Sequence, residues 1–342
     1  MTTMNTNRHG LANVGNTCYL NSAIQGLRHT RPFMEYLGTA AWERHRHPDR
    51  KGAALTEETA GLVAALQAPG NKMVVPSSFA RAFVAFASDY NDEIRLGAQA
   101  DAAEAIQILL DSLHTQLSRE VRMEITGKPT TGDHAELIRS LESWSSFFRK
   151  EYSPLVEGFY GQTQTSVICS ECGAKSTRYE PWSVFKLPIP GAERAGAPAP
   201  TLQECIRAAL AEETIDGYAC DGCKKKVSAR MEHAISRFPP QLIVSLKRFT
   251  NTGAKVRARI PYDENNVDLG EWRAWPALQP ATGVRYRVMS TIEHLGSSRG
   301  GHYCMRAREG SDWIVYDDSS VSLSGSGGAA GPDTYVLFLE RV

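Results

Sequence analysis

The stretch that decides the fold is GLANVGNTCYLN, residues 10–21 of a 342-residue chain. It runs into a segment with helical spacing, because apolar side chains recur at intervals of four and three residues from Leu20 to Leu27. We predict a helix from about Asn16 to Arg28, and this prediction places Cys18 in the first turn of the helix.

A cysteine at the start of a helix is a candidate nucleophile. The partial positive charge there favours thiolate over thiol, and thiolate is the form that attacks a carbonyl carbon. Gly15 and Asn16 allow tight backbone geometry just before Cys18, which could expose amide hydrogens to a developing oxyanion. The alternative is an inert thiol, since free cysteine is among the most buried residue types. Position alone favours the alternative, and a reactive cysteine also needs a base.

A base is offered by a hairpin predicted near the end of the chain, where His302 precedes one strand and Asp317 ends the next. If Glu309 and Gly310 form a two-residue turn, His302 lies directly opposite Asp317, with Cβ atoms ~4.5–5.5 Å apart. A four-residue loop makes the two residues diagonal neighbours instead. Asp317 would hold the imidazole and fix its tautomer while the other ring nitrogen faces the sulfur, and Asp318 would point to the opposite face. Spacing alone does not connect this hairpin to the early cysteine.

Four of the seven cysteines form two Cys-x-x-Cys pairs. Two such pairs supply the thiolates of a closed tetrahedral zinc site, which is structural because it leaves no open coordination position. A redox role is the alternative, but redox pairs sit at strand–helix junctions, which neither pair does. The interval between the pairs exceeds that of ordinary zinc ribbons, so a two-stranded excursion would join them, with zinc pinning its tip. Cys205 and Cys304 are predicted to be packing residues. The candidate zinc ligands are Cys169, Cys172, Cys220 and Cys223.

Helical patterns dominate the first half of the chain and strand patterns the second. A helix with a largely acidic face is predicted from about Gln99 to Leu117, and another from His134 to Phe148, where Asp133 and Glu136 resemble a capping box. The chain after Pro154 is rich in β-branched and aromatic residues with turn residues at short intervals. Helices followed by strands indicate an α+β architecture. The predicted strands are Leu242–Leu246, Tyr286–His294, Tyr303–Arg308, Trp313–Asp317 and Tyr335–Leu339.

The composition limits the classes of partner. Lys and Arg number 38 and Asp and Glu also number 38, so a net charge of zero gives no global reason to bind nucleic acid or anionic lipid. The longest apolar runs fall far short of the ~20 residues that span a bilayer, and residues 1–7 lack the apolar core of a secretory signal. We therefore expect an intracellular protein of the cytoplasm or nucleus, with no nucleic-acid or membrane partner, that acts as a monomer.

Several segments of the chain are informative in combination. They are residues 10–21, the helix start Gln99-Ala100-Asp101-Ala102-Ala103-Glu104, the two Cys-x-x-Cys pairs, the strand Val244-Ser245-Leu246-Lys247-Arg248-Phe249, and Gly301-His302-Tyr303 with Tyr316-Asp317-Asp318-Ser319. In this order they resemble the catalytic domain of ubiquitin-specific proteases. The resemblance extends from about Gly10 to Leu339.

This resemblance implies a papain-like cysteine protease with a right-hand architecture. Residues 10–154 would form a helical thumb that carries the nucleophile, after a flexible tail at residues 1–9. Residues 155–240 would form zinc-tipped β fingers, interleaved with strands of the palm. Residues 241–342 would form a β-sheet palm that carries the catalytic histidine and aspartate.

The catalytic residues follow from the resemblance position by position. Cys18 becomes the nucleophile, His302 the base and Asp317 the third member of the triad. Asn13 matches the family's oxyanion-hole asparagine, and Asp318 matches its accessory polar residue. The four cysteines of the two Cys-x-x-Cys pairs match the family's zinc ligands.

The start of the acidic helix is the implied contact for the substrate. Ubiquitin ends in a flexible tail with two arginines and a glycine pair, and Asp101 and Glu104 could pair with these arginines. A solvated helix face is the alternative. The chain has Ala105 where the family often has a large apolar residue and Ser245 where it commonly has histidine, which bears on substrate contacts and not on the triad. The implied substrate-binding residues are Gln99, Asp101, Glu104 and Tyr303.

The expected function is that of a deubiquitinating thiol hydrolase, which cleaves the peptide or isopeptide bond after the C-terminal glycine of ubiquitin. One structural zinc per chain and ubiquitinated proteins as substrates belong to this expectation. The runner-up is a protease for a ubiquitin-like modifier. An inactive ubiquitin-binding module is a rival from another class, which the intact Cys/His/Asp set argues against. A zinc-ribbon interaction protein is a further rival, and it does not explain the segment around Cys18.

Overall fold

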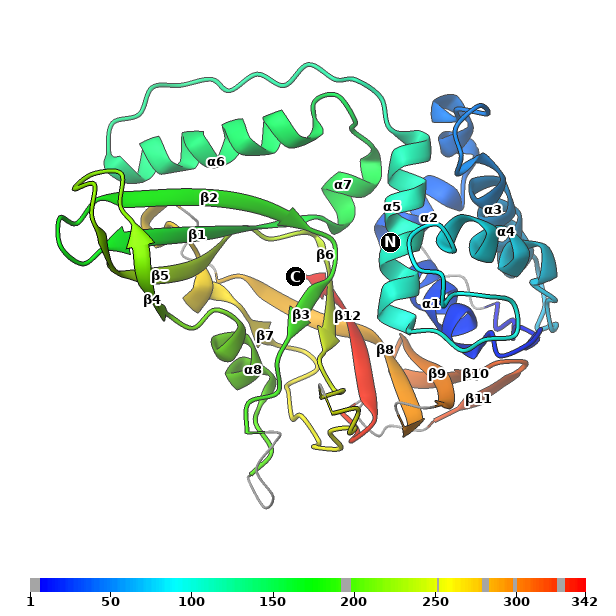
Figure 1. Ribbon diagram of the computed structural model, residues 1–342. Coiled ribbons are helices and arrows are strands. Elements are labelled where there is room, and N and C mark those ends of the chain that lie inside the picture. Colours follow the sequence, from blue (N-terminus) through cyan, green and yellow to red (C-terminus); the bar gives the residue numbers. More distant parts are fainter. Residues whose placement is uncertain (1–6, 192–197, 251, 279–282, 298–299, 325–329) are drawn as a thin grey trace.

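Helices form the first half of the chain and strands most of the second half (Figure 1), which confirms the predicted α+β class. The computed structural model describes residues 7–191, 198–250, 252–278, 283–297, 300–324 and 330–342. The helices are α1 Cys18–Arg28, α2 Arg31–Leu37, α3 Ala53–Gln67, α4 Ser77–Ala87, α5 Ala102–Leu117, α6 Gly132–Phe148, α7 Pro154–Phe159 and α8 Leu202–Ala209, with 3₁₀ turns η1 Ala40–His45, η2 Gly270–Trp272 and η3 Pro276–Leu278.

The strands form two sheets. The four-stranded sheet has the order β2-β1-β5-β4, and the eight-stranded sheet has the order β11-β10-β9-β8-β12-β6-β3, with β7 paired to β8. Strand β6 is buried throughout, as its apolar run predicts. No helix in the described ranges is both long and apolar enough to cross a membrane. The strands are β1 Gly161–Cys169, β2 Lys175–Trp182, β3 Phe185–Leu187, β4 Glu213–Ala219, β5 Lys226–Arg237, β6 Gln241–Leu246, β7 Val267–Asp268, β8 Arg285–Ser297, β9 Gly300–Glu309, β10 Asp312–Asp317, β11 Ser320–Leu323 and β12 Thr334–Arg341.

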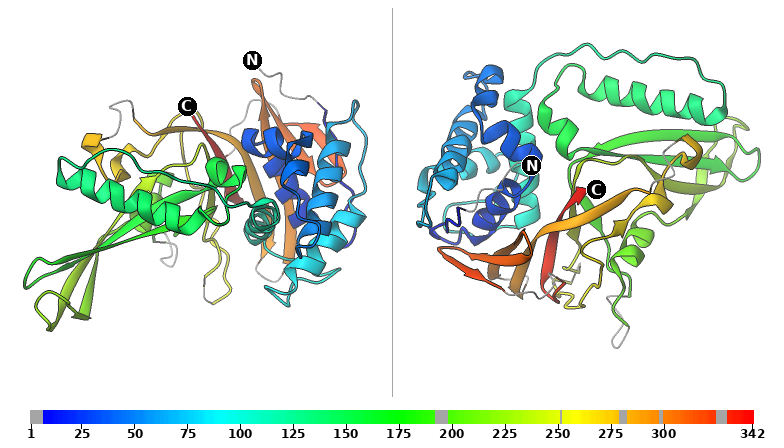
Figure 2. Two further views of the ribbon diagram at one scale, coloured as in Figure 1. Left: turned by 90° about the horizontal axis from the view of Figure 1, so that it is seen from above. Right: turned by 180° about the vertical axis from the view of Figure 1, so that it is seen from behind.

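We call α1–α5 the thumb helices, the eight-stranded sheet the palm sheet and the four-stranded sheet the finger sheet. The thumb helices lie at one end of the palm sheet, and the finger sheet extends from the other end (Figure 2). One helix crosses the segment boundaries expected from the sequence. Helix α6, from the 10–154 segment, runs along the finger sheet (Figure 1), where Glu136 accepts from Lys175 of β2 at 2.7 Å. Strand β3, from the 155–240 segment, pairs in parallel with β6 in the palm sheet and is one of the palm strands expected there.

Helix α1 is buried on every side because it lies between α5 and strand β9. The predicted apolar stripe from Leu20 to Leu27 is no more than 1% exposed. Gly26 makes the close approach to the palm sheet possible, since a Cβ there would lie 2.5 Å from the ring of Phe338 in β12. This packing holds Cys18, the first residue of α1, against the palm sheet.

Two helix starts differ from the sequence-based expectation. Helix α5 begins at Ala102 and not near Gln99, because the Asp101 carboxylate accepts from the N–H groups of Ala103 and Glu104 and ends the preceding loop. Helix α6 begins at Gly132, and the predicted Asp133–Glu136 capping box is wrong. Thr131 is the N-cap there, and its hydroxyl accepts from His134 N at 3.2 Å. Glu136 is drawn away from the helix start by its ion pair with Lys175.

The hairpin of β9 and β10 has a different register from the first alternative. Glu309 pairs with Asp312, so the two-residue turn is Gly310-Ser311 and not Glu309-Gly310. Gly310 has φ +66° at the first turn position, which a type II′ turn reserves for glycine. A turn at Glu309-Gly310 would have demanded that conformation of a glutamate. Tyr316 lies opposite Met305, which makes His302 and Asp317 diagonal neighbours, as the second alternative predicted.

The expected flexible tail at residues 1–9 is wrong for its last three residues, and residues 1–6 lie outside the described ranges. His9 is 2% exposed, and its ring nitrogens contact the carbonyl oxygens of Ala68 and Lys72 at 2.8 Å. Arg8 donates to Glu309 at the tip of the β9–β10 hairpin at 3.0 Å. Residues 8 and 9 therefore connect the end of α3 to the β9–β10 hairpin.

Glu309 is expected to stabilise the fold above acidic pH. Burial by itself would raise the pKa of Glu309, but contacts with His29, Tyr316 and Arg8 hold its pKa lower, at about 2. A depressed pKa in the folded state adds stability that is present above the unfolded pKa of about 4.3 and is lost as pH falls toward 2. We expect Glu309→Gln to lower the free energy of unfolding by about 2–3 kcal/mol at pH 7.

Urea denaturation at pH 7 and at a series of lower pH values measures this effect. The difference between the parent chain and Glu309→Gln should shrink as pH falls from about 5 toward 2. Glu142→Gln, on the exposed face of α6, is the matched control and should change stability by less than about 0.5 kcal/mol. Equal stability of Glu309→Gln and the parent chain at pH 7 would contradict the assignment.

Candidate active site and metal centre

Cys18 lies at the start of α1 and is 1% exposed. The loop before it makes a tight turn, with φ +112° at Gly15 and φ +56° at Asn16. Asn16 donates to the carbonyl of Gly97 at 2.6 Å, which fixes this turn against the loop that leads to α5. The first turn of α1 leaves backbone N–H groups free of helical partners, as every helix start does. These groups lie beside the sulfur, since the N–H groups of Tyr19 and Cys18 both lower the pKa of the thiol.

Burial and the helix start have opposite effects on the thiol. Burial is the largest effect and raises the pKa of Cys18 above its ordinary value, and the nearby charge of Asp318 raises it further. The backbone N–H of Tyr303 and the helix-start N–H groups lower the pKa, but less. The helix start thus has the predicted direction, and burial agrees with the alternative that position alone favoured. Attack by Cys18 therefore requires a base that removes the proton.

The predicted base and its carboxylate partner do come together. His302 Nε2 lies 2.5 Å from Asp317 Oδ1, across the diagonal of the hairpin. The pair is only partly covered, with 38% and 51% of the two side chains exposed. Because Nε2 faces Asp317, Nδ1 is the ring nitrogen that remains for the sulfur. The N–H of Tyr303, the next residue, bears on the Cys18 thiol, so the structure brings Cys18 and the His302 backbone to one place.

Asp318 and Asn13 form the rest of the cluster. Asp318 has φ +47° just after β10, which turns its carboxylate back toward the site. Its oxygens accept from Asn13 at 2.9 Å and from Asn21 at 2.8 Å. One polar atom each of His302, Asp317 and Asp318 lie within 4.8 Å of one another, so the expectation that Asp318 points to the opposite face is wrong. An alternating strand would have required it, but the strand ends one residue earlier.

Asn13 is fixed by its own loop. Its Oδ1 accepts from the N–H groups of Gly15 at 3.2 Å and Thr17 at 3.1 Å. This leaves Nδ2 as the outward-facing donor beside the start of α1, with one hydrogen directed to Asp318. An amide N–H in that place is suited to hydrogen bond a developing oxyanion together with the helix-start N–H groups.

The implied substrate-binding residues already have partners inside the chain. Asp101 caps α5 and also accepts from the hydroxyl of Tyr335 in β12. Glu104 accepts from Asn91 at 3.0 Å. Gln99 contacts the backbone of Gly301. Tyr303 is 6% exposed and packs beside the ring of His294 at a centroid distance of 4.6 Å, so its ring belongs to the core and contributes little surface.

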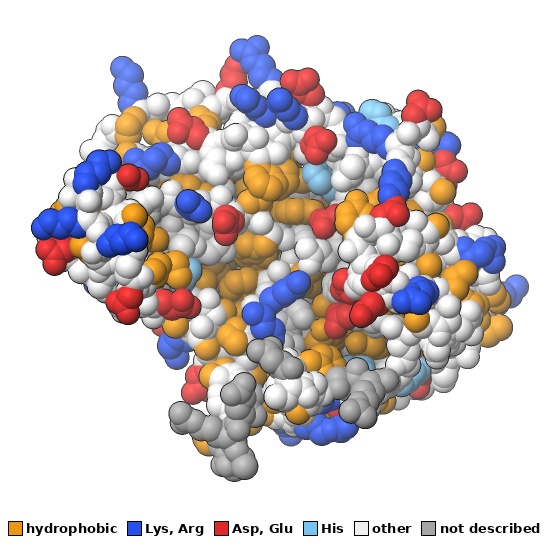
Figure 3. Space-filling view, viewed as in Figure 1, with side chains coloured by type: hydrophobic (Ala, Val, Ile, Leu, Met, Phe, Trp, Pro, Cys, Tyr) orange, Lys and Arg blue, Asp and Glu red, His pale blue; other side chains and the backbone are white. Residues whose placement is uncertain are grey.

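The face of the molecule seen in Figure 3 is hollowed. The hollow lies between the finger sheet on the left of the view and the thumb helices on the right, and apolar side chains gather on its floor. Acidic side chains stand on the thumb side of the hollow. A depression of this form offers an extended segment of another protein both apolar contact and negative charge.

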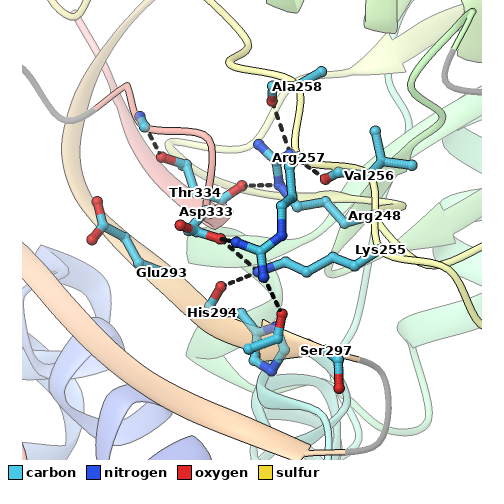
Figure 4. A network of polar contacts seen from close by, with 12 residues as sticks. Arg248, Lys255, Val256, Arg257, Ala258, Glu293, His294, Ser297, Asp333 and Thr334 are labelled. Atoms are coloured by element: carbon cyan, nitrogen blue, oxygen red, sulfur yellow. Dashed lines mark hydrogen bonds and ion pairs between the residues drawn. The ribbon is translucent and has the colours of Figure 1, made fainter. Parts of the chain in front are cut away.

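A charged network supports the palm sheet beside this hollow (Figure 4). Lys255 has a side chain only 3% exposed, and it contacts Asp333 at 2.6 Å and the carbonyl of His294. Arg248, which is fully buried, donates to the carbonyls of Thr334 and Val256. These contacts tie the segment after β6 to β8 and to the start of β12. Strand β8 pairs with β9 next to His302, so the network supports the strand beside the one that carries the base.

The four predicted zinc ligands form one cluster at the tip of the finger sheet. Cys169 and Cys223 have sulfurs 3.9 Å apart, and Cys172 and Cys220 have sulfurs 3.6 Å apart. All four sulfurs lie within 4.8 Å of one another, and none of the four is in a disulfide. A tetrahedral site with Zn–S bonds of about 2.3 Å places its sulfurs about 3.8 Å apart. The donor set and its spacing therefore fit a tetrahedral metal ion such as zinc.

The two Cys-x-x-Cys turns have the same backbone geometry. In the first, Gly173 N donates to the carbonyl of Cys169 at 3.0 Å, and in the second, Lys224 N donates to the carbonyl of Cys220 at 2.8 Å. The residue after each pair has a positive φ, +69° at Gly173 and +57° at Lys224. The N–H of Cys223 and that of Gly222 lower the pKa of Cys220 to about 7, which favours the thiolate that binds metal.

A thiol at a helix start, beside the strand that carries an imidazole–carboxylate pair, is the arrangement expected of a thiol hydrolase. The family profile described as "Ubiquitin carboxyl-terminal hydrolase" matches residues 9–339. The chain therefore belongs to the ubiquitin carboxyl-terminal hydrolase family, as the resemblance predicted.

Curated relatives agree with this family. The chain is 30% identical over 344 residues to ubiquitin carboxyl-terminal hydrolase 2 of Bos taurus, which covers 97% of this chain and 54% of the relative. It is 28% identical over 353 residues to ubiquitin carboxyl-terminal hydrolase 21 of Homo sapiens, with 97% and 61% covered. The chain thus spans little more than half the length of these relatives.

Solved structures show the same fold. The Ubp8/Sgf11/Sus1/Sgf73 DUB module of SAGA bound to ubiquitin aldehyde matches with a TM-score of 0.74 at 17% identity, over 100% of this chain and 71% of the other. The yeast SAGA DUB module with an Sgf73 variant matches with a TM-score of 0.74 at 18% identity, over 100% and 70%. The right-hand architecture expected from the resemblance is therefore the fold of this chain.

Sequence reasoning missed some contributors to the site. Asn21 is 3% exposed and holds Asp318, and no spacing in the sequence joins these two residues. Lys255 and Asp333 support β8 from distant segments, and no spacing in the sequence joins them. Gln99 was assigned to substrate, yet its partner is Gly301 in the palm sheet.

Proposed function

We propose that this chain hydrolyses the peptide or isopeptide bond after the C-terminal glycine of ubiquitin. The observation that carries the proposal is the place of Cys18 beside the N–H of Tyr303, the residue that follows His302 of the His302–Asp317 pair, in a chain that matches the family over residues 9–339. The solved relative with ubiquitin aldehyde in its title supports ubiquitin as the partner.

The chemistry follows from the placement of the groups. His302 Nδ1 takes the proton of the Cys18 thiol, and Asp317 on Nε2 holds the tautomer that leaves Nδ1 free to accept it. The sulfur attacks the carbonyl carbon of the terminal glycine, and Asn13 Nδ2 and the helix-start N–H groups bind the oxyanion. His302 then returns the proton to the departing amine, and a water molecule activated by the same imidazole releases the acyl group.

Recognition of the substrate divides among the three parts of the fold. The thumb helices supply the nucleophile, the palm sheet supplies the base, and the finger sheet extends away from the thumb helices (Figure 1). We propose that the carboxylates of Asp101 and Glu104 attract the two arginines of the ubiquitin tail. Both carboxylates keep acceptor capacity after their internal contacts, and Gln99 and Tyr303 remain proposed neighbours of the tail.

The metal of the cysteine cluster is proposed to be zinc, one ion per chain. Four thiolates favour zinc over harder cations, and a closed site of four protein ligands has a structural role. A measurement of bound zinc tests the metal site and not the activity, because every candidate function predicts the same ion. All seven cysteines are unpaired, and a reducing intracellular compartment keeps thiols in that state. We propose such a compartment and a monomeric enzyme.

Reaction with a panel of C-terminally electrophilic modifiers tests the function. Ubiquitin and several ubiquitin-like proteins, each ending in a thiol-reactive group, are incubated with the full chain, and the adduct is mapped by mass spectrometry. The expected result is a ubiquitin adduct on Cys18 and faster turnover of a ubiquitin–fluorophore amide than of the competing amides. Preference for another modifier would support the ubiquitin-like protease instead. Binding of ubiquitin without adduct or turnover would identify an inactive module.

A further inference from the structure

One edge of strand β9 has no partner strand next to the catalytic histidine. Strand β10 ends at Asp317, beside Cys304 in the register of the hairpin. Residues 301–303 therefore have β8 on one side and no strand on the other. Backbone groups alternate along an antiparallel strand, so Gly301 and Tyr303 direct their N–H and C=O groups to the same edge. An open edge beside a reactive centre needs a partner that replaces the missing strand.

The side chain of Gln99 fills the first position of this edge. Gly301 N donates to Gln99 Oε1 at 2.9 Å, and Gln99 Nε2 donates to Gly301 O at 2.5 Å. A primary amide carries a donor and an acceptor side by side, as a peptide group in a neighbouring strand does. The next position of the edge is taken by Cys18, because the N–H of Tyr303 bears on its thiol. Gln99 and Cys18 thus dock on one strand edge, with His302 between them.

The two docking points belong to different thumb elements. Cys18 starts α1, whereas Gln99 lies in the loop before α5, where Asp101 is held by Tyr335 of β12. Asn16, in the loop before α1, donates to Gly97 in that same loop. The loop before α5 is therefore tied to both the nucleophile loop and the palm sheet. Its contact with Gly301 fixes how far β9 stands from α1.

We propose that Gln99 is a positioning residue of the active site, which holds the edge of β9 so that His302 and the Tyr303 N–H meet Cys18. The proposal deepens the function proposed above and rests on it. The role differs from direct contact with substrate, because Gln99 acts through Gly301. Position 301 is glycine because of its other neighbour, β8, since a Cβ there would lie 2.1 Å from Leu295 O and 2.5 Å from His294 Nε2.

The pair of hydrogen bonds between Gln99 and Gly301 is specific to glutamine. Alanine leaves both backbone groups of Gly301 to water. Glutamate can accept from Gly301 N but cannot donate to Gly301 O, and its charge repels that oxygen. Gln99 is exposed, so neither substitution removes a buried group, and both variants should fold.

The first arm of the test does not need ubiquitin. Cys18 in the full chain is alkylated with iodoacetamide over a range of pH, and the Cys18 peptide is quantified by mass spectrometry. The groups that bear on Cys18 are Tyr19 on its own helix, Tyr303 on β9 and Asp318 after β10, and the proposed base His302 precedes Tyr303 on β9. The midpoint of the rate profile is expected to rise by about one pH unit in Gln99→Ala and Gln99→Glu, because the imidazole pairs less well with the sulfur.

The second arm measures turnover of a ubiquitin–fluorophore amide. A misplaced base should lower kcat by about 10- to 100-fold while KM stays within about twofold. Gln203→Ala, on α8 at the far side of the palm sheet (Figure 1), is the matched control and should leave both arms unchanged.

The outcomes separate the possible roles. A raised KM with an unchanged alkylation profile would assign Gln99 to substrate contact and overturn the positioning role. An unchanged profile and unchanged kinetics would overturn it as well. If the parent chain does not turn over ubiquitin, the proposed function fails, and the alkylation profile alone still decides whether Gln99 positions the pair.

Discussion

Replacement of Cys18 with alanine is expected to lower kcat for a ubiquitin–fluorophore amide on the order of 10⁵-fold, to the level of binding and oxyanion contacts alone. The reason is that in the proposed mechanism His302 moves the proton, Asp317 holds the imidazole and Asn13 binds the oxyanion, so no other group replaces the nucleophile. Steady-state kinetics at matched protein concentration measure the loss. Binding of ubiquitin, measured by calorimetry, should persist.

The fold of the Cys18→Ala variant should be unchanged. Cys18 is 1% exposed in the core of α1, and loss of one sulfur atom there costs about 1 kcal/mol. The matched control is Cys205→Ala, which removes a fully buried thiol from the separate core around α8 and should keep full turnover. Retention of more than a tenth of the activity by Cys18→Ala would assign the nucleophile elsewhere.

Much of what the sequence predicts rests on the spacing of residues that are close in the chain. The helix that starts near Cys18 follows from apolar periodicity, and the four zinc-site cysteines follow from two short turns, each of which needs only neighbours in sequence. The structure confirms the helix that starts at Cys18 and brings the four cysteines into one cluster. The α+β class likewise follows from the order of local patterns.

Features that depend on packing were harder to predict. The pKa of Cys18 depends on burial, a tertiary effect that outweighs the helix start. The hairpin register was shifted because Gly310 takes the first turn position. Asp318 turns back since β10 ends before it. Gln99 meets Gly301 across 202 residues, and only the folded chain joins them.

Removal of the metal ligand Cys220 is expected to release zinc and unfold the tip of the finger sheet. In Cys220→Ser the hydroxyl replaces a thiolate and binds zinc poorly. The cluster joins the β1–β2 turn to the β4–β5 turn, where strands β2 and β4 carry exposed and half-buried side chains. Zinc binding in small peptides contributes about 10–16 kcal/mol, so the tip has no other source of comparable stability. We expect the zinc content to fall from one ion per chain to none.

Hydrogen exchange locates the unfolding. Amides at the metal-bearing ends of β1, β2, β4 and β5 should lose protection in Cys220→Ser, while those of α1 and α5 keep it, because the thumb helices share a core with the palm sheet and not with the finger tip. Cys205→Ser, a buried cysteine outside the cluster, should retain one zinc per chain even if its core is weakened. One bound zinc and full protection at the tip in Cys220→Ser would show that the four cysteines do not form the metal site.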